Sequence, residues 1–106
     1  MSAYTSLDSA IATGPGEDRR LLKATAHHTM AVTLTGQPTT VEVVIEGSHT
    51  GYDWFPMGTL QCALIGGLKT LPATTHLVTY IRANLTRLEG GDSPTVTATI
   101  ASADDE

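Results

Sequence analysis

The sequence predicts an all-β protein, an antiparallel β-sandwich of the jelly-roll or immunoglobulin-like type with about six to eight strands and an extended N-terminal arm. Threonine occurs 18 times among 106 residues, against one phenylalanine and one tryptophan. Its β-branched side chain suits a pleated, half-solvated surface. Apolar and polar residues alternate with a period of two in several segments, and clusters of Gly, Pro, Asp and Ser separate those segments. We therefore predict strands and no helix.

The length and charge bound the domain organisation and the partners. We expect one domain over residues 20–103, preceded by an arm at 1–19 and followed by an acidic tail at 104–106. The net charge of −5 argues against the phosphate backbone of nucleic acid as the main partner. No apolar run approaches the roughly 18–20 residues of a membrane helix, and we expect no secretion signal because residues 1–19 lack a basic region followed by an apolar one. We therefore expect neither nucleic acid nor membrane as a partner.

Residues 1–19 show no sustained periodicity and end at the helix-incompatible break Gly14-Pro15-Gly16. Two interpretations stay open. The segment is either a frayed terminus or an extended arm that becomes ordered against a neighbouring subunit. In the second case Tyr4, Leu7 and Ile11 are its anchors.

The first half of the domain is predicted to contain three strands, at residues 21–24, 28–35 and 40–48. Turn formers at 36–38 separate the second strand from the third and predict a hairpin. Alternation places six apolar side chains on the inward faces of that hairpin: Met30, Val32, Leu34, Val41, Val43 and Ile45.

The middle of the chain is predicted to hold a turn at residues 48–53 and an irregular strand at 54–58. Because Pro56 cannot donate to a strand ladder, this strand is expected at a sheet edge or with a bulge. Trp54 is the largest apolar side chain, so we expect it to be central to the core.

The last part is predicted to contain strands near residues 60–64, 77–88 and 95–101, with loops at 71–73 and 89–94. Helix competes for 77–88, but β-branched residues, a tyrosine and the lack of a helix cap favour a strand. Within that strand Leu77, Ile81 and Leu85 are expected on one face and Val78, Tyr80 and Arg82 on the other. The inward residues of the final strand are expected to be Val96, Ala98 and Ile100.

The histidines do not predict a metal site. His27 and His28 are adjacent, so on a strand their side chains point to opposite faces. His49 and His76 are isolated in or near turns. Because a zinc site needs three or four converging ligands, surface or strand-end histidines are the favoured interpretation, and no metal is expected.

No catalytic constellation is evident, and we expect neither an enzyme nor a cofactor. The motif Gly-x-Ser-x-Gly does not occur. Cys62 lies in an alternating apolar stretch and is expected to be a buried small hydrophobe. The loop acids Asp53 and Glu89 do not define a carboxylate pair.

Two arginines and one tyrosine are expected at the surface, the arginines in ion pairs and the tyrosine as a possible ligand contact. Arg82 and Arg87 are expected to face Glu42 or Glu46 across the sheet as surface ion pairs. Tyr52, at a loop tip with Asp53, His49 and Arg82 near it, is the candidate contact for a glycan.

Two stretches carry a resemblance to known proteins: VEVVIEGSHTGYDWFPMG at 41–58 and THLVTYIRANLTRLEGGDSPTVTATIA at 75–101. Together they resemble small β-sandwich structural proteins of tailed bacteriophages, including capsid decoration (cement) proteins. They are also distantly similar to the jelly-roll sandwiches of discoidin-like and carbohydrate-binding modules. The resemblance implies that Trp54 packs between the sheets and that Arg82 lies near the turn at 48–53.

The turn departs from the commoner form of this pattern, Gly-Ser-x-Asp-Gly, because Thr50 stands where that form has Asp. If that acid caps the turn or pairs with Arg82, Asp53 is its substitute here. No ion or ligand site is carried over from the resemblance.

The resemblance implies a non-enzymatic virion structural protein, made in the host cytoplasm and placed on the capsid exterior as a decoration protein. Its partner would be the major capsid protein, which it would bind as a homotrimer or as separate monomers. A tail or head–tail structural subunit and a host-surface glycan-binding module are the alternatives. The candidate contact residues are Tyr4, Leu7, Ile11, Tyr52, Asp53 and Arg82.

Overall fold

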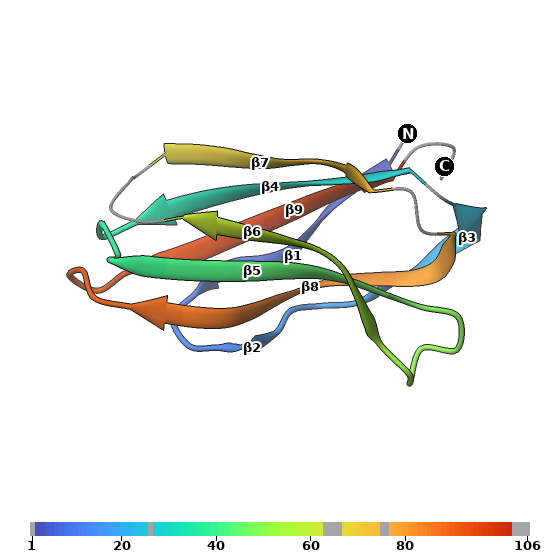
Figure 1. Ribbon diagram of the computed structural model, residues 1–106, viewed down its shortest axis with the longest axis horizontal. Helices are drawn as coiled ribbons and strands as arrows, with labels where there is room; N and C mark the ends of the chain where they lie inside the picture. Colours follow the sequence, from blue (N-terminus) through green and yellow to red (C-terminus); the bar gives the residue numbers. More distant parts are fainter. Residues whose placement is uncertain (1, 26, 63–66, 75–76, 103–106) are drawn as a thin grey trace.

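The computed structural model describes residues 2–25, 27–62, 67–74 and 77–102, and within them every regular element is a β-strand. The strands form two antiparallel sheets that face each other as a β-sandwich (Figure 1). The predicted fold class is confirmed. The strands are β1 (Ser2–Ala10), β2 (Gly14–Pro15), β3 (Arg19–Thr25), β4 (His28–Thr35), β5 (Thr40–Ser48), β6 (Phe55–Cys62), β7 (Gly67–Thr74), β8 (Val78–Glu89) and β9 (Thr95–Ser102).

One sheet has the strand order β1-β9-β4-β7, and the other has β2-β8-β5-β6, with β3 also paired to β8. The predicted hairpin of residues 28–35 and 40–48 is therefore wrong, because β4 and β5 belong to opposite sheets. The chain crosses between the sheets at the predicted turn, where the Gly36 carbonyl accepts a hydrogen bond from Asp92 N at 2.9 Å. Crossing lets the apolar faces of β4 and β5 meet across the core instead of side by side.

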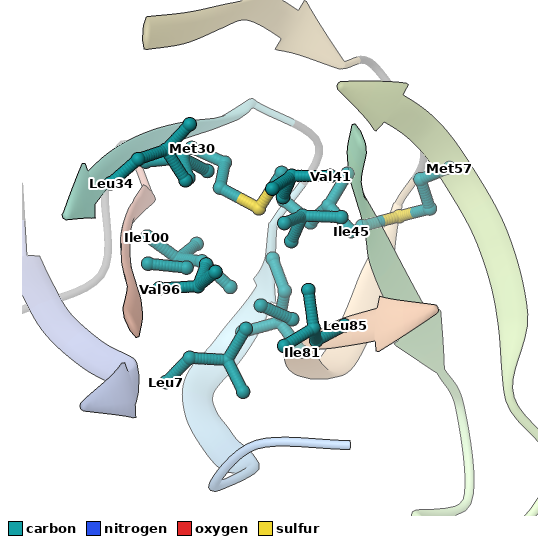
Figure 2. Packing of buried hydrophobic residues seen from close by; sticks show 14 of the residues in the cluster. Leu7, Met30, Leu34, Val41, Ile45, Met57, Ile81, Leu85, Val96 and Ile100 are labelled. Atoms are coloured by element: carbon teal, nitrogen blue, oxygen red, sulfur yellow. The ribbon is translucent and has the colours of Figure 1, made fainter. Parts of the chain in front are cut away.

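The core lies between the sheets and is built from alternate residues of β4, β5, β8 and β9 (Figure 2). All nine predicted inward residues of β4, β5 and β9 are buried. The predicted faces of β8 are correct from Ile81 to Leu85 but reversed at its start, where Val78 is buried and Leu77 is 56% exposed. The ladder between β3 and β8 is irregular there, between the Arg20–Tyr80 and Thr25–Val78 pairs, so the alternation changes phase.

The segment expected as an N-terminal arm is part of this sandwich. β1 pairs with β9 at a sheet edge, and β2 and β3 run along β8 in the other sheet. Leu7 is 5% exposed and belongs to the core. The hydroxyl of half-buried Tyr4 donates to the Ile81 carbonyl at 2.7 Å. Tyr4 and Leu7 therefore anchor the segment to its own chain, because its apolar side chains fill the open side of the core.

Ser6 links β1 of one sheet to β8 of the other by hydrogen bonds. Its buried hydroxyl donates to the Glu17 carbonyl at 2.7 Å and accepts from Ala83 N at 2.9 Å. Gly16 N donates to the Ala83 carbonyl at 2.8 Å, and a Cβ on Gly16 would collide with the backbone of Ser6. These bonds satisfy backbone groups of β8 where the ladder with β2 and β3 is interrupted.

The edge strands β6 and β7 test two further predictions. β6 is an edge strand with an irregularity opposite Ile45 and Glu46, as the position of Pro56 predicted. The loop predicted at 71–73 is wrong, because these residues belong to β7, another edge strand, where a proline is tolerated. Leu64, His76, residues 104–106 and the side chain of Cys62 lie outside the described residues. In the part of the chain that the structure describes, no helix suited to crossing a membrane is found.

Candidate functional site

The candidate site is the loop between β5 and β6, here called the tyrosine loop (residues 48–54), together with the outer face of β5 and β8 on which it rests. The loop lies at one end of the sandwich (Figure 1). Ser48 Oγ accepts hydrogen bonds from Thr50 N at 3.1 Å and Gly51 N at 2.8 Å. Thr50 Oγ1 accepts in turn from Tyr52 N at 3.1 Å and Asp53 N at 3.2 Å. These two overlapping turns hold the loop in one conformation.

Gly51 seats the loop against β8. Its φ is +87°, a left-handed conformation that other residues rarely adopt, and an added Cβ would lie 3.3 Å from the ring of Tyr80. The loop backbone therefore packs closely on an aromatic side chain of the sheet.

Trp54 fastens the other end of the loop to the outer face of the sheet. The Arg82 guanidinium carbon lies 4.1 Å from the centre of the Trp54 ring system. Arg82 Nε donates to Glu46 Oε1 at 2.8 Å, and Asn84 Nδ2 donates to Glu46 Oε2 at 3.3 Å. The ring thus covers an arginine that a carboxylate already orients.

The expectation that Trp54 is central to the core is wrong. Trp54 precedes β6 and is partly exposed, while Met57 from the same segment is buried in the core. Arg82 offers the ring a cation–π contact on the outer face, a kind of contact worth about 0.5–2 kcal/mol. The prediction made from the size and apolarity of Trp54 alone therefore placed this side chain on the wrong face of the sheet.

The acid that pairs with Arg82 is Glu46, one of the two predicted across the sheet, and not Asp53. The side chains of Arg82 and Glu46 are 21% and 15% exposed, so the pair is shielded from solvent. Thr50 takes the role of turn cap that we assigned to Asp53. The structure therefore uses Arg82 to hold the loop.

A second polar group lies farther along the same face. Glu42 accepts hydrogen bonds from Gln61 Nε2 at 3.0 Å and Thr86 Oγ1 at 2.8 Å. The Gln61 bond first, and then the Thr86 bond, lower the pKa of Glu42. Arg87 pairs with Glu89 at 3.1 Å rather than with either predicted acid.

The predicted contact residues separate into two groups. Tyr52 is 87% exposed and Asp53 is exposed, and the loop that carries them rests on Arg82 through Trp54. Tyr4 and Leu7 make their contacts within the chain, Tyr4 with the Ile81 carbonyl and Leu7 with the core. Ile11 is 78% exposed, but it follows Ala10, which pairs with Val96 at the other end of the sandwich.

His27 precedes β4, and His28 is the first residue of that strand. His27 is exposed, whereas His28 is buried and its Nδ1 lies 2.8 Å from Ser102 Oγ. His49 and Phe55 have ring centres 5.8 Å apart. Among the described ranges, no group of three or more His, Cys, Asp or Glu side chains is placed to hold a metal ion.

The sequence analysis missed the Trp54–Arg82 contact, although it predicted that Arg82 would face Glu42 or Glu46 across the sheet. The sequence did contain a signal for this contact: the alternation of apolar and polar residues places both Glu46 and Arg82 on the outward faces of their strands. Two opposite charges on the outer face next to a tryptophan favour an external stack.

No protein-family model and no curated protein sequence matches this chain. Among solved structures, it is similar to the SPBc2 prophage-derived protein YomS, with a TM-score of 0.60 and 10% identity over 96% of this chain and 92% of that chain. It is equally similar to CBM32-3 of a family 31 glycoside hydrolase from Clostridium perfringens (TM-score 0.60, 16% identity, 95% and 75% covered). A pectin-binding carbohydrate-binding module gives a TM-score of 0.57 at 17% identity, covering 98% and 90%. These similarities establish a β-sandwich shared with a phage-derived protein and with carbohydrate-binding modules.

Proposed function

We propose that this chain is a non-enzymatic structural protein of a tailed-phage particle, acting as a decoration protein that binds the major capsid protein on the outside of the capsid. The resemblance of residues 41–58 and 75–101 to phage sandwich proteins supports this proposal. The similarity to YomS over nearly the full length of both chains supports it further.

The observation that carries the proposal is the tyrosine loop. It is held by four hydrogen bonds, by the Gly51–Tyr80 contact and by the Trp54–Arg82 stack, yet it presents Tyr52 at 87% exposure. An ordered loop loses little conformational entropy when a partner covers it. Tyrosine is also one of the residues that most often dominate binding energy at protein interfaces.

On a capsid, many copies would bind a repeated surface, each as a homotrimer subunit or as a separate monomer. Each contact can then be modest, because a regular array of partners raises total occupancy. We assign the capsid contact to Tyr52 and Asp53.

The test is co-sedimentation of the purified chain with undecorated capsids of the phage that encodes it. Saturable binding is expected, with Tyr52→Ala weakening it by about tenfold, equivalent to about 1.4 kcal/mol. Ile11→Ala, at the opposite end, is the matched control and should bind like the natural chain. Absence of saturable binding would exclude capsid decoration, and normal binding by Tyr52→Ala would exclude this loop as the contact.

A second candidate function is recognition of a host-surface glycan by the same loop. It is favoured by an exposed tyrosine beside a fixed tryptophan–arginine pair, since aromatic faces and a few fixed polar groups are typical of sugar sites. Two of the similar sandwiches are carbohydrate-binding modules. A glycan array probed with the natural chain and with Tyr52→Ala separates the two functions: hits lost in the variant would favour the glycan role, whereas an empty array would remove it.

A further inference from the structure

Two arginines lie on the outer face of the sheet next to the tyrosine loop. Arg20 of β3 pairs with Tyr80 of β8, and Arg82 follows two residues later on the same face of β8. Arg20 and Arg82 are therefore diagonal neighbours with Cα atoms about 7–8 Å apart, a spacing over which two long side chains can reach one ligand. We call Arg20, Tyr80, Arg82 and Trp54 the arginine corner.

Arg82 is held in place while most of its hydrogen-bond donors stay unused. Nε donates to Glu46 Oε1 at 2.8 Å, and the Trp54 ring lies against the guanidinium. Among the described residues, neither Nη group of Arg82 has a hydrogen-bond acceptor, and the side chain is 21% exposed. A guanidinium fixed in this way loses little freedom when a ligand binds to the fork of its two Nη groups.

The other polar groups of the corner are donors as well. In the part of the chain that the structure describes, the Tyr80 hydroxyl, the Trp54 indole N–H and the exposed Arg20 form no hydrogen bond or ion pair. Indole and guanidinium groups can only donate, and a phenol hydroxyl can donate. A ligand that completes these bonds must therefore supply acceptor oxygens.

The acids around the corner favour a carboxylate over a phosphate or a polyanion. Glu46 is bonded to Arg82, and the exposed Asp18 and Asp53 lie within two residues of the corner in the chain. Within the described ranges, neither aspartate forms an ion pair with Arg20 or Arg82. Three nearby carboxylates repel a doubly charged phosphate more strongly than a singly charged ligand. The two oxygens of a carboxylate also match the guanidinium fork with two parallel hydrogen bonds.

We propose that the arginine corner binds a carboxylate group of the partner. Arg82 donates both Nη groups to its two oxygens, and Arg20 reaches it from the neighbouring strand. Placing this carboxylate on an Asp or Glu side chain of the capsid protein rests on the proposed function, whereas carboxylate binding by the corner does not. Tyr52 then contacts the partner beside that acidic side chain.

The first test is a titration of the full chain with sodium acetate at neutral pH, with sodium chloride lowered to keep the ionic strength constant. Trp54 is the single tryptophan of the chain, so its indole N–H signal in a nitrogen–proton correlation spectrum reports on the corner. We expect a saturable shift with half-saturation at about 10–100 mM, a weak affinity suited to so small a ligand. An absent or non-saturating shift, or tighter binding of inorganic phosphate, would overturn the proposal.

Three variants test the residues. Arg82→Lys keeps the charge but removes the fork, and should raise the half-saturating acetate concentration at least about fivefold. Arg87→Lys makes the same change in the same strand, at an arginine paired with Glu89, and should leave the titration unchanged. Arg20→Gln leaves the Trp54–Arg82 stack intact and should weaken acetate binding at least about twofold.

An unchanged titration in Arg82→Lys, or equal weakening in Arg87→Lys, would contradict the assignment. Weakening in Arg82→Lys together with an unchanged titration in Arg20→Gln would overturn it as well, because the shift would then follow the conformation of the tyrosine loop instead of the paired arginines.

Capsid binding separates this proposal from the proposed function. Acetate at its saturating concentration should lower co-sedimentation of the natural chain with capsids at least about twofold, relative to chloride at the same ionic strength. Equal binding in the two salts would overturn the carboxylate contact and leave capsid decoration in place. Absence of capsid binding with an intact acetate titration would exclude decoration and leave the corner as a carboxylate site.

Discussion

The N-terminal segment (residues 2–20) and the tyrosine loop both looked like contact regions in the sequence, and the structure separates them. In the first, Leu7 enters the core, Ser6 bonds to β8 and Tyr4 bonds to Ile81. In the second, the backbone is equally well bonded, yet the Tyr52 side chain is left in solvent. Tyr4 and Leu7 are therefore used by the fold itself, and only Ile11 of the three expected anchors remains exposed. An ordered loop with an unburied aromatic side chain offers that side chain to a partner.

Shortening Leu7 should give the largest effect in the N-terminal segment. Leu7→Ala removes a side chain that is 5% exposed, so we expect the free energy of unfolding to fall by about 2–5 kcal/mol. Denaturant unfolding measures this loss. Ile11→Ala, an exposed residue of the same segment, should change stability by less than about 0.5 kcal/mol. An unchanged stability in Leu7→Ala would return this segment to the status of a free arm.

Alkaline pH should loosen the same segment. Burial is the main cause that raises the pKa of Tyr4 from 10.0 to about 12. Below pH 10 the phenol is neutral in both folded and unfolded chains, so its contribution is complete. As the pH rises from about 10 to about 12, the unfolded chain loses the proton first, and about 2–3 kcal/mol of stability is lost.

Urea unfolding between pH 9 and 11 measures the onset of this loss, with Tyr4→Phe as the control. The variant lacks the titrating hydroxyl, so its stability should fall less steeply with pH. Parallel curves for the two proteins would mean that Tyr4 does not keep its proton in the folded state.

The smallest expected effects on stability distinguish Gly51, which holds the tyrosine loop against β8, from Tyr52, which the loop exposes. Gly51→Ala should lower stability by about 1–2 kcal/mol, because the left-handed φ is strained for alanine and the added Cβ approaches Tyr80. Tyr52→Ala should change stability by less than about 0.5 kcal/mol, since the side chain is exposed. Thermal unfolding of both variants checks this contrast. A large loss in Tyr52→Ala would place Tyr52 in the fold instead of at a contact.

The inward residues of β4, β5 and β9 followed from the sequence because alternation is local. A strand with one buried face shows a period of two wherever it lies in the fold. The turns at 36–38, 48–53 and 89–94 were predictable for the same reason, since Gly, Pro, Asp and Ser act on the backbone next to them. The same outward phase predicted that Arg82 would face Glu42 or Glu46.

The tertiary structure alone decided which strands are neighbours and what each side chain meets. β4 and β5 have the same alternation whether they form a hairpin or face each other across the core. Trp54 lies outside the core because Arg82, 28 positions later in the chain, makes a cation–π contact with its ring on the outer face. Leu7 is buried because β1 pairs with β9, which turns this side chain into the core between the two sheets. Periodicity reports how a segment meets solvent, whereas pairing and stacking depend on residues distant in the chain.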